Sequence, residues 1–127
     1  MTGKTVLLRT IKTKKSGWRE KSVSVVPPSV QIALREAMKE EKVPDSDFDT
    51  LLWIMAQESV GKVDAQNSKS SARGLYQLTK AHYHLNPRGV DSFGNAKEEC
   101  QGGIRYILRR YRSADKAKAF WLKNHWY

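Results

Sequence analysis

Residues 48–78 read FDTLLWIMAQESVGKVDAQNSKSSARGLYQL, and this stretch passes from an apolar helical pattern into a polar loop. Four apolar residues recur at helical spacing: Leu51, Leu52, Ile54 and Met55. Gly61 is a natural terminator of such a helix. We therefore predict a helix that starts at Asp45 or Ser46 and ends near Gly61, followed by loops with short turns or strands over residues 62–94.

Glu58 continues the apolar face of this helix, because positions three, four and seven residues earlier hold Met55, Ile54 and Leu51. Burial and the negative end of the helix dipole both disfavour the charged carboxylate, so we expect a raised pKa. A carboxylic acid protonated near neutral pH can donate to a leaving oxygen, as glycoside cleavage requires. The alternative is a Glu at a fraying helix end that reaches solvent or pairs with a nearby Lys.

Three further helices are predicted around this segment. Ser29 can cap the first, which stops at Pro44 and has its apolar positions at Val30, Ala33, Leu34, Ala37 and Met38. The next covers residues 95–112, with one apolar stripe of Cys100, Ile104, Ile107, Leu108 and Tyr111. Ser113 can cap the last, which runs to about Lys123. We interpret Cys100 as a small buried apolar residue.

The first 27 residues form a separate basic extension by composition. Residues 5–12 and 22–26 favour strands and KKSG between them favours a turn, which suits either a β-hairpin or a loosely ordered basic arm. Pro27 and Pro28 end this region. We therefore divide the chain into an extension over residues 1–27 and one domain over residues 28–127, long enough for a single core.

The net charge of +10 is concentrated at the two ends of the chain. Residues 1–21 carry seven Lys and Arg against one Glu, and residues 97–127 carry eight against three acidic residues. Such charge favours polyanions, among them nucleic acid, anionic membrane surfaces and bacterial envelope polymers. The start of the chain has too few apolar residues for a secretory signal, so we expect synthesis in the bacterial cytoplasm without one.

Two motifs in this order are typical of one family. Gln57-Glu58-Ser59 at a helix end, followed by Ser70-Ser71-Ala72-Arg73-Gly74-Leu75-Tyr76-Gln77-Leu78, resembles the soluble lytic transglycosylase signature of a Glu-Ser pair, a short loop and Gly-Leu-Met-Gln. The resemblance covers about residues 48–127. It implies an α+β, predominantly helical, lysozyme-like domain with a small β-rich or loop region.

The resemblance also implies roles for the matched residues. Glu58 would be the catalytic acid and then the base, and Ser59 would position its carboxylate or the sugar. Gly74 would let the backbone approach the glycan. Tyr76 stands where the family has Met in the floor of the cleft, and Gln77 would bind substrate near the reacting bond.

The later helix resembles the family's as well, with two departures. Glu99 takes the position of a family Asn and shares a helix face with Tyr106, and we expect both to face substrate. The adjacent Gly102 and Gly103 serve either ligand approach or helix packing. Phe120 stands where the family has a tyrosine whose hydroxyl touches the catalytic Glu, so Tyr106 or another group would take that role.

The implied reaction is cleavage of the MurNAc-GlcNAc bond of peptidoglycan with formation of a 1,6-anhydro ring. Hydrolysis of the same bond by a muramidase and a basic nucleic-acid-binding module remain as alternatives. We interpret Asp64 and Asp91 as turn-forming or solvated residues, although either could be a second catalytic acid. The three histidines lack partners at metal-ligand spacing, and we expect no metal and no other cofactor.

Size and charge also resemble bacteriophage lysis proteins or virion components. We accordingly expect a monomer that acts on glycan strands in the periplasm or cell wall. Its basic ends would grip an anionic envelope. We expect no nucleic-acid partner.

Overall fold

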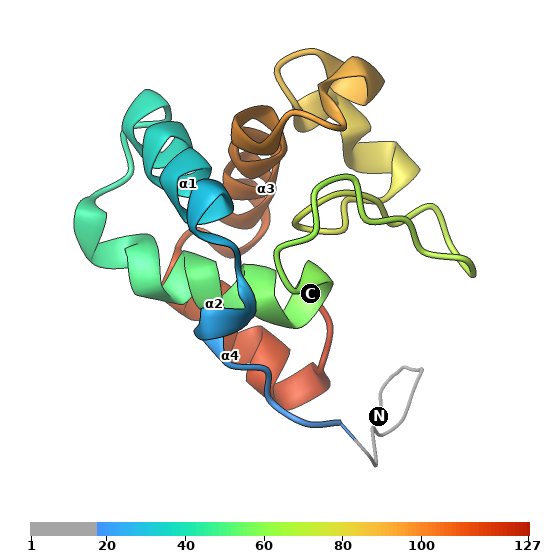
Figure 1. The fold of residues 1–127 in the computed structure, drawn as a ribbon. Coiled ribbons are helices and arrows are strands. Elements are labelled where there is room, and N and C mark those ends of the chain that lie inside the picture. The colour runs from blue at the N-terminus through green and yellow to red at the C-terminus, as the bar shows by residue number, and fades with distance from the viewer. Residues whose placement is uncertain (1–17) are drawn as a thin grey trace.

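The computed structural model describes residues 18–127, and it is helical with irregular connections (Figure 1). Its four α-helices are α1 (Pro28–Glu40), α2 (Phe48–Ser59), α3 (Ala96–Tyr111) and α4 (Ala114–Asn124). Four short 3-10 helices join them: η1 (Val23–Val25), η2 (Asp45–Asp47), η3 (Lys80–Leu85) and η4 (Gly89–Ser92). No helix in the described range has the length and apolar character needed to span a membrane.

Helix α2 lies at the centre of the fold. It contacts α1 and α4, while α1 and α3 pack side by side (Figure 1). Six consecutive residues of α2, from Leu51 to Ala56, are buried, so the helix is enclosed on most of its circumference. The end of this helix is therefore fixed by packing on several sides, which is what a precisely placed functional side chain needs.

Residues 60–95 connect α2 to α3 and carry little regular structure apart from η3 and η4. Two isolated antiparallel bridges, Gln66 with Arg73 and Arg73 with Leu78, give this segment its β character. The predicted loop region with short turns is confirmed, and the mainly helical, lysozyme-like fold class with it.

Gly102 and Gly103 serve packing. A Cβ atom on Gly102 would lie 1.7 Å from the Asn86 Oδ1 atom, and one on Gly103 would lie 2.3 Å from the Tyr76 ring. Both distances are far below any contact that carbon atoms tolerate. The glycines therefore admit the loop residues Asn86 and Tyr76 against α3, so close packing is the reason for them, although the partners are loop residues and not another helix.

The predicted helices agree with the structure to within a few residues. The helix expected to start at Asp45 or Ser46 starts at Phe48, after η2, and the helix expected to stop at Pro44 ends at Glu40. Helix α1 begins at Pro28 with Pro27 as its cap, so Ser29 lies inside the first turn and does not cap it. Proline at the first helical position needs no hydrogen-bond partner, since that N–H is unpaired in any helix. Asn95 and Ser113 cap α3 and α4 through their side chains, as expected for such residues.

The strand predicted over residues 22–26 does not form. Val23–Val25 is a turn of 3-10 helix, capped by the Ser22 side chain, which accepts a hydrogen bond from the Ser24 N–H. Within residues 18–127 this β-prone run has no strand beside it, and an unpaired run gains little from an extended backbone. The other predicted strand, over residues 5–12, lies outside the described residues.

Helix α2 ends in two left-handed residues, Val60 at φ 51° and Gly61 at φ 77°. A Cβ atom on Gly61 would lie 2.9 Å from both Val26 Cα and Pro27 Cδ, so this turn packs directly against the segment before α1. Glycine is required at position 61 both for its backbone conformation and for this contact.

Replacing Gly61 by Ala is expected to lower the free energy of unfolding by about 2 to 4 kcal/mol, because left-handed strain and the clash add. Gly89→Ala is the matched control. Gly89 also has a positive φ, of 59°, but nothing lies within 4 Å of its Cβ position. Urea denaturation of both variants measures the difference, and an equal loss in the two would contradict the contact with Val26.

Candidate active site

Glu58 lies in the last turn of α2, where its carboxyl group is enclosed while the residue keeps some exposed surface. Burial raises the pKa of Glu58 to about 7, against a smaller lowering by a hydrogen bond from Trp121 and by the charge of Lys21. The predicted rise in pKa is confirmed, and burial is its main cause. At neutral pH this carboxyl group can hold or release a proton.

The indole of Trp121 orients the Glu58 carboxyl group. Trp121 Nε1 donates a hydrogen bond of 2.6 Å to Glu58 Oε2 from the facing helix α4. An oxygen that accepts such a bond is the less favourable place for the acid proton, so the proton of neutral Glu58 belongs on Oε1. The arrangement leaves one carboxyl oxygen for proton transfer and fixes the other.

Lys21 is held beside Glu58 by its main chain. The Gln57 side-chain amide donates to the Lys21 carbonyl over 2.8 Å, and the Lys21 N–H donates to Gln57 Oε1 over 2.9 Å. This pair of bonds fixes the backbone of residue 21 against the helix turn that carries Glu58. The Lys21 charge in turn favours the ionised carboxylate.

Aromatic rings surround the Trp121 indole. The Trp18 ring stacks on the His125 ring at a centroid distance of 4.4 Å and lies 5.1 Å from the Trp121 ring. Trp53 meets Trp121 edge to face at 5.5 Å. Tight packing on several sides prevents the indole from turning away from Glu58.

The Ser59 hydroxyl supports the turn after α2. It donates to the Leu75 carbonyl over 2.8 Å and accepts from the Gly61 N–H over 3.2 Å. Ser59 is buried and joins the helix end to the Gly74–Leu75 segment. Its expected role, to position the Glu58 carboxylate or the sugar, remains a prediction.

The Glu99 carboxylate organises the loop region from inside. It accepts hydrogen bonds from the N–H groups of Asp64, Leu75 and Gly94, the shortest at 2.7 Å. Burial raises its pKa, and these three N–H donors oppose the rise. Only 2% of the Glu99 surface is exposed, so the loop region encloses the carboxylate, and its expected role in substrate binding remains a prediction.

Tyr76 and Gly74 are also enclosed. The Tyr76 hydroxyl donates to the Leu51 carbonyl of α2 over 2.8 Å, and the residue is 1% exposed. A Cβ atom on Gly74 would lie 2.9 Å from the Phe93 ring and 3.0 Å from Glu99 Oε1. Both residues build the core beneath the loop, and their expected contacts with the glycan remain predictions.

Gln77 is half-buried and braces the loop. Its amide Nε2 donates to the carbonyls of Ala65 and Gly74. The backbone at Gln77 has a positive φ of 54°, and these bonds help to hold it there. Its role in substrate binding remains a prediction.

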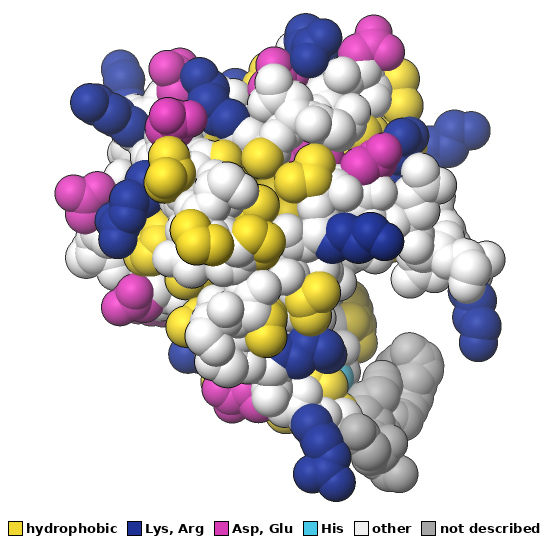
Figure 2. Space-filling view, in the orientation of Figure 1, with side chains coloured by type: hydrophobic (Ala, Val, Ile, Leu, Met, Phe, Trp, Pro, Cys, Tyr) yellow, Lys and Arg dark blue, Asp and Glu magenta, His cyan; other side chains and the backbone are white. Residues whose placement is uncertain are grey.

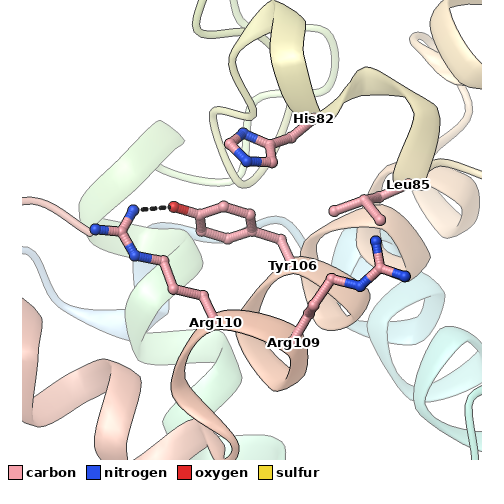
Figure 3. A pocket seen from close by; sticks show the side chains of 5 residues that line it. All are labelled: His82, Leu85, Tyr106, Arg109 and Arg110. Atoms are coloured by element: carbon pink, nitrogen blue, oxygen red, sulfur yellow. Dashed lines mark hydrogen bonds between the residues drawn. The ribbon is translucent and has the colours of Figure 1, made fainter.

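The Tyr106 hydroxyl does not reach Glu58. It accepts a 2.6 Å hydrogen bond from Arg110 Nη1, one turn later on α3 (Figure 3). The hydroxyl of another tyrosine, Tyr127, interacts electrostatically with Glu58, and it donates a hydrogen bond of 2.6 Å to the Tyr76 carbonyl. The direct donor to Glu58 is Trp121.

Neither candidate for a second catalytic acid acts on Glu58. Asp64 forms an ion pair of 2.6 Å with Arg73, and Asp91 is exposed on η4. Within residues 18–127, the charged group that acts on the Glu58 pKa is Lys21. Among the described residues, no second carboxylate acts on the Glu58 carboxyl group.

The sequence did not predict three features of the site. These are the hydrogen bond from Trp121 to Glu58, the two hydrogen bonds between Gln57 and the Lys21 backbone, and the packing of Trp18 against Trp121. Phe120 rather than Trp121 occupies the position of the family tyrosine, so the motif pointed to the wrong residue. The clustering of aromatic residues at the end of the chain was the available signal, but it suits a core and a site equally.

Fold and site together define a helical, lysozyme-like domain with one buried acid at the end of its central helix. The sequence model of the transglycosylase SLT domain matches residues 34–125, so the chain belongs to the soluble lytic transglycosylase family. This family is one of transglycosylase enzymes with peptidoglycan as substrate. Comparisons with curated proteins and with solved structures returned no significant match.

Trp121→Phe is expected to move the Glu58 pKa further upward, because the indole bond favours the ionised carboxylate. The basic limb of the activity profile should shift to higher pH, and the maximal rate should fall about 10-fold as the carboxyl group loses its orientation. Trp53→Phe is the control, since Trp53 Nε1 donates to Glu20 and not to Glu58. A profile that shifts equally in both variants would contradict this role of Trp121.

Proposed function

We propose that this protein is a lytic transglycosylase that cleaves the β-1,4 bond between MurNAc and GlcNAc and closes a 1,6-anhydro ring on MurNAc. The observation that carries the proposal is the buried Glu58 carboxyl group, with a pKa of about 7 and one oxygen fixed by Trp121. A group that is protonated in half of the molecules at neutral pH can serve as acid and then as base.

In the proposed first step, Glu58 Oε1 gives its proton to the glycosidic oxygen, and the bond from that oxygen to C1 of MurNAc breaks. The acetamido group of the substrate stabilises the cationic C1. The ionised Glu58 then takes the proton of the C6 hydroxyl, whose oxygen forms the new bond to C1. The carboxyl group is thereby restored to its protonated state, and no water is consumed.

The single acid supports this reaction over hydrolysis. Retaining glycosidases use two carboxyl groups about 5 to 5.5 Å apart, and inverting enzymes place a second one at about 6.5 to 9.5 Å to activate water. In the described part of the chain, Asp64 is committed to Arg73 and no carboxylate contributes to the Glu58 pKa. A muramidase-type hydrolase is nonetheless the second candidate, since it would use the same acid.

Product analysis separates the two reactions. Purified sacculi are digested with the protein, and the soluble fragments are examined by mass spectrometry with and without borohydride reduction. Anhydro-MurNAc ends, which borohydride leaves unchanged, support the transglycosylase. Reducing MurNAc ends would show a hydrolase, and the absence of any fragment would refute both.

A nucleic-acid-binding module is less well supported by the surface. Arg105, one of the arginines that suggested it, is bound to Glu41 through two hydrogen bonds. On the face in Figure 2, Lys and Arg side chains are dispersed among acidic and hydrophobic ones and do not form a stripe. Salt-sensitive binding to duplex DNA without action on sacculi would favour this alternative.

We further propose that this protein is a phage-type lysin that acts at the cell wall. The net charge of +10 supports it, because a cationic protein is attracted to an anionic envelope. Binding to intact sacculi should weaken as salt is raised.

A further inference from the structure

Segment 18–21 lies ahead of η1 and packs against α2 and α4 (Figure 1). The family match covers residues 34–125, so this segment stands outside it. Three of its four residues nevertheless contact groups that surround Glu58, and these are Trp18, Glu20 and Lys21. The surroundings of the acid therefore include a part of the chain that the family model does not cover.

Gln57, the residue before Glu58, determines where the Lys21 main chain lies. Its amide group donates to the Lys21 carbonyl over 2.8 Å and accepts from the Lys21 N–H over 2.9 Å. The amide also donates to the Trp53 carbonyl over 3.2 Å, and only 6% of Gln57 is exposed. Because both ends of this buried amide are bonded, it cannot turn without breaking hydrogen bonds in the interior. The Lys21 main chain is therefore held against the helix turn that carries Glu58.

The Lys21 side chain is exposed and brings a positive charge to bear on Glu58. Among residues 18–127, the four ion pairs involve other cations, namely Arg73, Arg88, Lys97 and Arg105. Lys118 of α4 lies over an indole ring, 4.7 Å from its centroid. Burial holds the pKa of Tyr111 and of Tyr127, which also face Glu58, above the usual range, so both are uncharged near neutral pH. Within the described range, the charge that the carboxylate meets is thus that of Lys21.

Trp18 and Glu20 hold the indole of Trp121 and that of its neighbour Trp53. The Trp18 ring lies 5.1 Å from the Trp121 ring, and Glu20 Oε2 accepts a hydrogen bond of 3.0 Å from Trp53 Nε1. Trp53 in turn meets Trp121 edge to face. Since Trp121 is the donor to Glu58, both residues of the segment act on the acid through this indole.

The ring of Trp18, and not its N–H, accounts for this placement. Trp18 Nε1 is buried and finds no hydrogen-bond partner in the described part of the chain. Burial of such a group is unfavourable, so the ring contacts must offset it. They are the stack on His125 at 4.4 Å and the contact with Trp121. Trp18 thus serves as a packing surface for the group that orients the acid.

We propose that segment 18–21 is a working part of the active site. Trp18 is a positioning residue that keeps the Trp121 indole on Glu58. Lys21 supplies the positive charge that stabilises the Glu58 carboxylate once its proton has passed to the glycosidic oxygen. The inference rests on the proposed function, because both roles belong to the acid step described above.

A titration without substrate tests the role of Lys21. In ¹⁵N-labelled protein, the indole N–H signal of Trp121 reports the ionisation of Glu58, because the bond between them strengthens when the carboxylate forms. The wild-type midpoint is expected at about pH 7. Lys21→Met should raise it by about half a pH unit, since a charge that favours the ionised form is lost. Lys21→Arg keeps the charge and should restore the wild-type midpoint.

The matched control is Arg19→Met, which removes a positive charge from an exposed residue of the same segment. It should leave the midpoint of the Trp121 signal unchanged. An unchanged midpoint in Lys21→Met, or equal shifts in Lys21→Met and Arg19→Met, would overturn the role of Lys21.

Kinetics on soluble glycan strands test the role of Trp18. Trp18→Leu should lower kcat about 10-fold and leave KM unchanged, because the orientation of the acid matters in the transition state and not in binding. Trp18→Phe keeps a ring against Trp121 and should retain most of the rate. A wild-type kcat in Trp18→Leu, or an equal loss in Trp18→Phe, would overturn this role.

The Trp121 signal also separates this inference from the proposed function. Its dispersed position in each variant shows that the variant is folded, and its midpoint does not depend on any reaction. If the midpoints follow the expectation while the wild type cleaves no strand, the proposed function fails and the action of Lys21 on the carboxyl group stands. If strands are cleaved while the midpoints are all equal, the proposed function stands and the role of Lys21 fails.

Discussion

Replacing Glu58 by Gln is expected to reduce the release of fragments from sacculi by about 10³-fold or more. The amide keeps the shape of the side chain and its bond from Trp121, but it has no proton to give at neutral pH. Loss of both the acid and the base function accounts for an effect at the upper end of general acid-base contributions, about 10² to 10⁴. Turbidity clearing of purified sacculi measures it, and retained activity would refute the assignment of Glu58.

The same variant also provides a test of folding, because the difference between its stability and that of the wild type should depend on pH in a defined direction. The folded pKa of Glu58, about 7, lies above its ordinary value of 4.5. Wild-type stability is therefore complete below about pH 4.5 and decreases as the pH rises through 7, by about 3 kcal/mol. Glu58→Gln lacks this loss, so it should equal the wild type at pH 4 and exceed its melting temperature at pH 8.5. A variant less stable at both pH values would show that lost activity reflects lost folding.

Replacing Glu99 by Gln is expected to cost about 2 to 4 kcal/mol of folding free energy, although the two side chains have nearly the same shape. Both Glu99 oxygens accept backbone N–H groups: Oε1 accepts from Leu75 and Oε2 from Gly94. An amide would direct its own N–H₂ at one of these donors and leave that donor unpaired in the interior. The melting temperature should fall, and activity should fall with the order of the loop.

The adjacent Glu98 supplies the control. It accepts from Arg88 and from the Ser92 hydroxyl at the surface of α3, so Glu98→Gln keeps most of its contacts. We expect a change below about 1 kcal/mol, as is usual for exposed pairs. Equal destabilisation by the two substitutions would contradict the structural role of Glu99. Comparison of the two variants by thermal unfolding at pH 7 decides the matter.

The regular part of the fold was predictable because its signals are local. Apolar residues at helical spacing located α1, α2 and α3, and Ser113 located the start of α4, which its side chain caps. Glu58 stood out for the same reason, since a carboxylate on an apolar face is conspicuous. Its burial and raised pKa followed from that placement.

The contacts of the other motif residues depended on tertiary structure. Tyr76 and Glu99 lie at motif positions, but their direction depends on how close α3 and the loop approach, which Gly74 and Gly103 determine. The distance between α3 and the loop cannot be read from the spacing of these residues along the sequence. Helical periodicity likewise could not show that an indole from α4 meets Glu58, because the two residues are brought together only by the crossing of two helices.

The contacts of Trp18 and Lys21 limit how far the chain can be shortened without changing the surroundings of Glu58. The family match starts at residue 34, yet the ring that buttresses Trp121 and the cation that acts on Glu58 come from residues 18 and 21. Tyr127, on the other side of the match, anchors the C-terminal end to Tyr76. A shortened protein cut at the family boundaries would keep Glu58 and lose the groups that act on its carboxyl group and on Trp121.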